Sequence, residues 1–152
     1  MNYDLKEIKV KVDVAIGVLF KNDSFLLENG VNERSVSHKL AEYLQQEIPD
    51  WNVDCEYNRK GSALKTLERI RECSEERKTD RVFPDIIIHQ RNTKINLLVL
   101  EIKTKDEDPI CDIQKLILFT SDRECKYNFG SFIKFNRAEK PDLKWFKDGE
   151  EI

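Results

Sequence analysis

Two acidic residues and a lysine stand at the ends of two apolar segments of this chain. Asp85 opens the apolar run 86–88, and Glu101 and Lys103 close a second run that begins at Leu97. Opposed carboxylates repel each other unless one is protonated or a cation lies between them, and hard divalent ions prefer oxygen ligands. A lysine beside such an ion can orient a water molecule and stabilise negative charge on a phosphorus centre. These residue types therefore suggest phosphodiester hydrolysis.

The two apolar segments have the pattern of a β-hairpin. The residues between them, 90–95, are polar and typical of a turn. A turn centred near 92–93 places Asp85 opposite Glu101 or one residue away from it, and directly opposed side chains lie about 4.5–5.5 Å apart. Because side chains alternate along a strand, Glu101 and Lys103 should share one face. We expect these three side chains to converge where the hairpin strands diverge.

A third acidic residue begins an amphipathic helix. Apolar residues recur at helical spacing from 32 to 48, Asn32 is suited to be the N-cap, and Pro49 ends the run. Glu33 lies three residues before Val36 and therefore on the inward side of the first turn. Its role is either to complement the helix dipole or to approach the acids of the hairpin.

Length and composition indicate one domain spanning residues 1–152. The sequence has no run of eighteen apolar residues and no signal-peptide profile, so we expect a cytoplasmic protein without membrane contact. The four cysteines are widely spaced and form no Cys-x-x-Cys pair, which makes zinc or a disulfide framework unexpected. We expect reduced, mostly buried thiols, and we interpret His38 and His89 as ordinary helix-surface and strand-end residues.

Two segments are less easily interpreted. Residues 10–20 alternate as a strand would, but the stripe at positions 8, 12, 16 and 19 is helical, and periodicity alone leaves both structures open. The segment 59–82 has apolar residues at helical spacing and a charged outer face. The net charge of −3 argues against nonspecific nucleic-acid binding, but between Arg59 and Arg81 there are eight basic and five acidic residues.

Five short motifs occur in a fixed order along the chain. They are Asn-Glu-Arg-Ser at 32–35, Val-Asp-Cys-Glu-Tyr-Asn-Arg at 53–59, Pro-Asp-Ile-Ile-Ile-His at 84–89, Glu-Ile-Lys at 101–103 and Tyr-x-x-Gly at 127–130. With this ordered set the chain resembles the PD-(D/E)XK nuclease superfamily, and within it a group of small stand-alone bacterial or phage proteins. The resemblance covers about residues 30–135.

The resemblance implies an α/β (α+β) fold. Its restriction-endonuclease-like core would contain a central mixed β-sheet of about four strands flanked by α-helices. Residues 1–31 would form a helical cover, with a second short helix from Asp23, and 59–82 would be a charged helical insertion. A crossover helix at 111–120 would lead to a strand at 130–135. We expect the tail from Arg137 only to pack one aromatic side chain on the domain.

The resemblance also implies a metal-dependent nuclease. Asp85, Glu101 and the backbone carbonyl of Ile102 would hold Mg²⁺ or Mn²⁺, and Glu33 would support the ion directly or through water. Lys103 would position the attacking water. The product would carry a 5′-phosphate.

Four polar residues are candidates for contacts with nucleic acid. Gln114 and Lys115 lie on the expected crossover helix, and Arg59 and Lys60 begin the basic segment. Lys115 could equally be a surface lysine held by Asp112 at i, i+3. The implied partner is nucleic acid, with DNA preferred to RNA, in phage defence, restriction or DNA repair. Cleavage of both duplex strands by one small domain would most simply require a homodimer.

A second class of function also fits the sequence. The domain could be a catalytically inactive binding or regulatory subunit with a nuclease fold, acting through a protein partner of a defence or prophage system. A hydrolase of nucleotides is a third reading, although the chain lacks a glycine-rich phosphate loop. Metal-dependent cleavage distinguishes the first class from the second.

Overall fold

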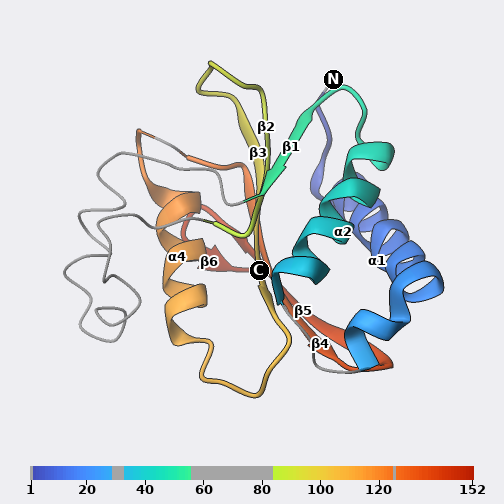
Figure 1. Ribbon diagram of the computed structural model, residues 1–152. Helices are drawn as coiled ribbons and strands as arrows, with labels where there is room; N and C mark the ends of the chain where they lie inside the picture. The colour runs from blue at the N-terminus through green and yellow to red at the C-terminus, as the bar shows by residue number, and fades with distance from the viewer. Residues whose placement is uncertain (1, 29–32, 56–83, 125) are drawn as a thin grey trace.

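A computed structural model of the chain describes residues 2–28, 33–55, 84–124 and 126–152. A six-stranded mixed sheet lies at the centre, with helices on both faces (Figure 1). In chain order the elements are α1 Leu5–Glu28, α2 Glu33–Glu47, β1 Asn52–Cys55, β2 Ile86–His89, β3 Asn96–Lys103, α4 Ile110–Ser121, β4 Phe129–Asn136, β5 Glu139–Lys147 and β6 Glu150–Glu151.

The strand order follows the sequence from β1 to β6. The pair β3 and β4 is parallel, and the other neighbouring pairs are antiparallel. Parallel strands need a crossover connection, which helix α4 provides on one face of the sheet, while α1 and α2 cover the other face (Figure 1). The expected mixed sheet between helices is confirmed.

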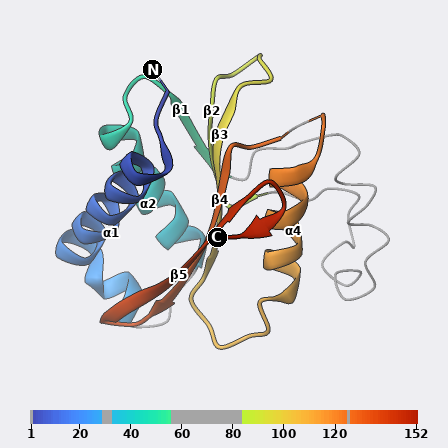
Figure 2. The same ribbon diagram turned by 180° about the vertical axis from the view of Figure 1, so that it is seen from behind.

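The expected number of about four strands is wrong, because the tail adds β5 and β6. Figure 2 shows the β4–β5 hairpin extending beneath α1, and β6 turning back toward α4. Strand β5 alternates charged, exposed residues with apolar ones. Its charged residues resemble the rest of this charged sequence, so the alternation was not recognised as a strand. A signal was present in Asp148-Gly149, since both residues have positive φ and form the two-residue turn that Asp-Gly favours between strands.

Helix α1 settles the ambiguity of the N-terminal segment. The helical stripe is buried, including Ile8, Val12 and Leu19, whereas Val10 and Val14 of the alternating pattern are exposed. The backbone leaves helical geometry at Asp23, where the second short helix was expected to begin. Burial of one stripe against α2 and the sheet therefore outweighs the β-propensity of the valines.

A separate core lies between α4 and the other face of the sheet. Tyr127 is fully buried there and its ring meets Phe119 edge to face. Gly130 lets β4 approach α4 closely, because an added Cβ would lie 3.1 Å from Thr120 Cγ2 and 3.3 Å from Leu116 Cδ2. The interpretation of Tyr127 and Gly130 as structural residues is confirmed.

The predicted hairpin and its register are confirmed. Ile86 pairs with Leu100, so Asp85 and Glu101 occupy the next opposed positions. Leu100 belongs to the core under α1 and α2, whereas Val99 belongs to the core under α4. By alternation, Glu101 points toward α4.

Several predictions concern residues that the structure does not describe. They are the cap Asn32, the nucleic-acid candidates Arg59 and Lys60, and the insertion 59–82. In the described part of the chain, no helix is both long enough and apolar enough to cross a membrane.

Candidate metal and catalytic site

Two carboxyl groups meet at the open end of the hairpin. The backbone N–H of Ile102 donates a hydrogen bond to Asp85 Oδ2 at 2.7 Å, which fixes the Asp85 side chain against β3. Glu101 is only 1% exposed and lies opposite Asp85 in the hairpin register. Two carboxyl groups placed in this way repel each other when both are ionised.

The electrostatics of the pair agree with this geometry. Burial raises the pKa of Asp85 to about 6, although the Ile102 amide and the Lys115 ammonium oppose the shift. Burial, followed by the charges of Asp85 and Asp112, raises the pKa of Glu101 well above its ordinary range against the effect of Lys115. Perturbed carboxyl groups of this kind are common at functional sites.

The donor set fits a hard divalent ion. Glu101 Oε1 is buried and has no hydrogen-bond donor near it among the described residues, although buried acceptors are normally satisfied. In the same part of the chain no group of three Asp, Glu, His or Cys side chains could hold a metal ion. Mg²⁺ does not need such a group, because one or two carboxylates with water and phosphate oxygens commonly hold it. Asp85 and Glu101 supply these two ligands.

Lys103 lies on β3 beside the acid pair and is tied to the crossover helix. Its Nζ lies 3.1 Å from Asp112 Oδ2 and 3.5 Å from Glu107 Oε2, and its side chain is 10% exposed. Burial alone would lower the pKa of Lys103, but the charge and hydrogen bond of Asp112, with Glu33 and Glu107, outweigh it and raise the pKa. Lys103 is therefore an ammonium ion at neutral pH.

Lys115 also enters the site from α4. Its Nζ lies 3.9 Å from Glu101 Oε2 and 3.7 Å from Asp112 Oδ1, and its side chain is 13% exposed. The interpretation of Lys115 as a surface lysine is thus wrong, whereas its expected contact with Asp112 is present. Gln114, the other candidate on this helix, is half-buried.

Asp112 is a residue of this site whose full role the sequence pattern does not reveal. The i, i+3 spacing predicts only a contact with Lys115, but the Asp112 side chain is 8% exposed and contacts both lysines. Its contact with Lys103 joins α4 to β3 and depends on how the crossover helix packs on the sheet. The i, i+3 spacing predicted the contact of Asp112 with Lys115 but not its contact with Lys103.

Glu33 begins helix α2, on the face of the sheet opposite α4, and lies near the end of β3 that carries Lys103. Its Oε2 accepts a hydrogen bond from the backbone N–H of Thr104 at 3.2 Å. Its negative charge contributes to the raised pKa values of Asp85 and Lys103. Glu33 therefore lies near the acid pair and does more than complement the helix dipole.

A cavity of about 310 Å³ opens beside the acids. Its lining includes Glu33, Asp85, His38 and Cys55. A larger groove of about 620 Å³ runs between α1 and β5, but none of the predicted site residues lines it. The site is defined by its charged groups and not by the volume of the cavity beside it.

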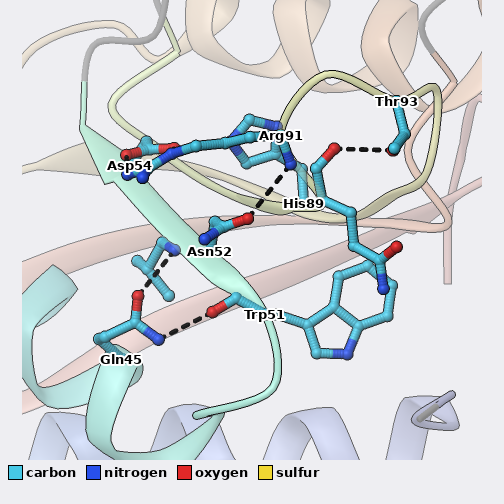
Figure 3. A network of polar contacts seen from close by, with 9 residues as sticks. Gln45, Trp51, Asn52, Asp54, His89, Arg91 and Thr93 are labelled. Atoms are coloured by element: carbon cyan, nitrogen blue, oxygen red, sulfur yellow. Dashed lines mark hydrogen bonds and ion pairs between the residues drawn. The ribbon is translucent and has the colours of Figure 1, made fainter.

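A second polar network fastens β1 to the hairpin (Figure 3). His89 is 1% exposed, and its Nε2 lies 2.7 Å from Asp54 Oδ2, to which Arg91 Nε also donates at 2.9 Å. Gln45 joins α2 to this strand by donating to the Trp51 carbonyl at 2.8 Å. His89 is a strand-end residue as expected, but it is a buried hydrogen-bonding residue and not an ordinary one.

Two of the four cysteines are described. Cys111 is buried and Cys55 is exposed, and neither forms a disulfide. The expectation of mostly buried thiols fits Cys111 and does not fit Cys55, which lies at the end of the described part of β1. His38 is on the helix surface as predicted, 3.4 Å from Glu42.

Comparison with known proteins adds no relative. No model of a known protein family matches the chain, and no curated protein sequence matches it. An inference about function therefore depends on the chemistry of the side chains that meet at the open end of the hairpin.

Proposed function

We propose that the protein is a metal-dependent nuclease that hydrolyses phosphodiester bonds. The observation behind the proposal is that Asp85 and Glu101 occupy opposed positions of the hairpin, and that the buried Oε1 of Glu101 has no hydrogen-bond partner in the described part of the chain. Lys103 extends from the same strand two residues further on. Two adjacent carboxylates with one charged lysine form a suitable donor set for Mg²⁺ and a phosphate group.

Each residue would have a separate role. Asp85 and Glu101 would hold Mg²⁺ or Mn²⁺, together with the Ile102 carbonyl, and Glu33 would support the ion. The bound ion would polarise the phosphate and acidify a water molecule. Lys103 would orient that water and stabilise negative charge, because its raised pKa keeps it an ammonium ion and unsuited to act as a base.

The fold supports the proposal without being specific to it. A hairpin that carries the acids, a helix α2 that adds Glu33 and a crossover helix α4 that adds a lysine agree with the arrangement that a restriction-endonuclease-like core would have. Fold alone does not determine chemistry. DNA as substrate and a role in phage defence, restriction or repair belong to the proposal through the resemblance alone. The cytoplasmic location is proposed from the composition of the sequence, and the homodimer from the need to cut two strands.

One observation favours the second candidate, an inactive binding or regulatory subunit. Lys103 pairs with Asp112, and Lys115 lies 3.9 Å from Glu101, so lysines already compensate acids of the site without a metal ion. A structural network of buried ion pairs can also perturb pKa values. Metal binding and cleavage separate the two candidates.

The test is cleavage of single-stranded and duplex DNA and RNA with Mg²⁺, Mn²⁺ or EDTA. Asp85→Asn retains an acceptor for the Ile102 amide, and Lys103→Met retains the length of the side chain, so both variants should fold. We expect metal-dependent cleavage by the wild type and a loss of at least roughly a hundredfold in each variant. If the wild type neither cleaves nor binds metal by calorimetry, the binding-subunit candidate replaces the nuclease.

A further inference from the structure

Lys115 lies between two acids without closing on either of them. The 3.9 Å to Glu101 Oε2 and the 3.7 Å to Asp112 Oδ1 both exceed the usual length of an N–H···O hydrogen bond, which is about 2.7–3.2 Å. The side chain is 13% exposed and is thus largely held inside the site. Its contacts with these two acids are therefore electrostatic and longer than hydrogen bonds.

The charge of Lys115 acts on both members of the acid pair. It opposes the rise of the pKa of Asp85 and also that of Glu101. Lys103, in contrast, is held by Asp112 and Glu107. Lys115 is thus the lysine whose charge compensates the acid pair.

A divalent ion bound by Asp85 and Glu101 would supply the positive charge that the Lys115 ammonium now supplies to these acids. Two cations at one carboxylate repel, and the repulsion is stronger in a partly desolvated site than in water. Lysine has a flexible four-carbon stem, so its ammonium can move while its backbone stays in the helix. Asp112 offers an acceptor on the other side of Lys115.

We propose that Lys115 is the internal counter-ion of the Asp85–Glu101 pair, and that a divalent ion displaces its ammonium from Glu101 toward Asp112 and the substrate phosphate. The inference rests on the proposed function, because it assumes that the pair binds a metal ion. It adds a regulatory property to the site. In the metal-free protein the Lys115 ammonium compensates the buried acids. It becomes available to bind phosphate only after the ion has displaced it.

The test compares Lys115→Met with the control Lys126→Met. Lys126 also pairs with an acid, Asp148. It precedes β4, whose first residues pair with the start of β3, whereas Lys103 is at the other end of β3, so Lys126 is remote from the site. Both variants lose one positive charge. Calorimetry with Mn²⁺ at pH 8 should give a dissociation constant roughly tenfold lower for Lys115→Met, and one within about twofold of the wild type for Lys126→Met.

The same variants report on the metal-free protein. In EDTA, Lys115→Met should melt several degrees below Lys126→Met because it leaves the acid pair uncompensated. Adding Glu101→Gln should recover most of that loss, since the double variant removes both members of the Lys115–Glu101 pair. This double variant also gives the comparison if Lys115→Met alone does not fold. A double variant as unstable as Lys115→Met would overturn the counter-ion role.

Failure of the inference can be told apart from failure of the proposed function. Equal Mn²⁺ affinity of the wild type and Lys115→Met would overturn the displacement and leave the nuclease proposal standing. Absence of Mn²⁺ binding in both proteins at millimolar concentration would overturn the displacement and the nuclease together.

Discussion

The ammonium of Lys103 and the carboxylate of Asp112 lie 3.1 Å apart, and their side chains are 10% and 8% exposed. This contact joins the last residue of β3 to the first turn of α4. Asp112 also lies 3.7 Å from Lys115, so a single acid faces both lysines of the candidate site. In the proposed nuclease Asp112 would be a positioning residue, because it contacts both lysines that would touch phosphate.

Asp112→Asn should weaken catalysis without abolishing it. The amide keeps the shape of the side chain but removes the negative charge that holds Lys103, so we expect a roughly tenfold to hundredfold lower cleavage rate. Because Asp112 raises the pKa of Lys103, that pKa should fall in the variant. Nuclear magnetic resonance of the lysine side chain measures the pKa directly.

Glu107→Gln is the matched control for Asp112→Asn. Glu107 also contacts Lys103, at 3.5 Å, but its side chain is 58% exposed and solvent screens its charge. We expect its cleavage rate to stay within about threefold of the wild type. Equal losses in the two variants would mean that general electrostatics, and not positioning by Asp112, explain the effect.

Glu33→Gln tests the acid of α2. Glutamine can still accept the hydrogen bond from the Thr104 amide, so the free energy of unfolding should change by less than about 0.5 kcal/mol. If Glu33 supports the ion, Mn²⁺ affinity should fall roughly tenfold or more. Glu42→Gln on the same helix, an exposed residue, should retain the affinity. Unchanged affinity in Glu33→Gln would limit Glu33 to a structural contact with β3.

Local patterns predicted the parts of the site that lie on one hairpin. Strand alternation and the position of the turn determine that Asp85 faces Glu101, and both features can be read from the segment 84–103. The helical stripe of α2 likewise predicted the inward position of Glu33. These inferences needed no information about distant parts of the chain.

Other parts depend on packing between distant elements. The contact of Lys103 with Asp112 requires the crossover helix to lie over β3, and nothing in the spacing of the two residues determines that. The buried pair of His89 and Asp54 likewise depends on the pairing of β1 with β2. Strand β5 was missed because its charged face resembles an unstructured tail.

Two glycine substitutions test the packing of α4 on the sheet and the helix propensity of α1. Gly130→Ala puts a Cβ 3.1 Å from Thr120 Cγ2 in the core under α4, and overpacking should lower the free energy of unfolding by about 1–3 kcal/mol. At Gly17, an exposed position of helix α1, an added Cβ meets no atom within 4 Å among the described residues. Gly17→Ala should raise stability by about 0.5–1 kcal/mol through helix propensity. Urea unfolding measures both, and the opposite signs are the decisive result.

Asp54 should make the stability of the protein sensitive to acid. Hydrogen bonds from Arg91 and from His89 hold the pKa of Asp54 below its usual value, against a smaller opposing effect of burial. A lowered pKa in the folded state stabilises the protein above the unfolded value of about 3.9, and this stabilisation is lost as pH falls through the folded value. The contribution is therefore present at pH 7 and disappears in acid.

Asp54→Asn removes this contribution. At pH 7 the variant should be less stable by about 1.5–3 kcal/mol, the usual value of hydrogen bonds to a charged group. At pH 3 the difference from the wild type should shrink. Asp50→Asn, at an exposed position, serves as the control. A difference that is the same at both pH values would contradict the assigned role of the charge.

The nuclease proposal requires that Asp85 and Glu101 bind a catalytic divalent ion. The most direct test is a single-turnover cleavage assay on labelled DNA, in which Mn²⁺ is titrated into the wild type, Asp85→Asn and the remote control Gly17→Ala. We expect saturable, metal-dependent cleavage by the wild type and the control, with almost none by Asp85→Asn. Cleavage by Asp85→Asn at the wild-type rate and metal concentration would contradict a metal-binding role for Asp85.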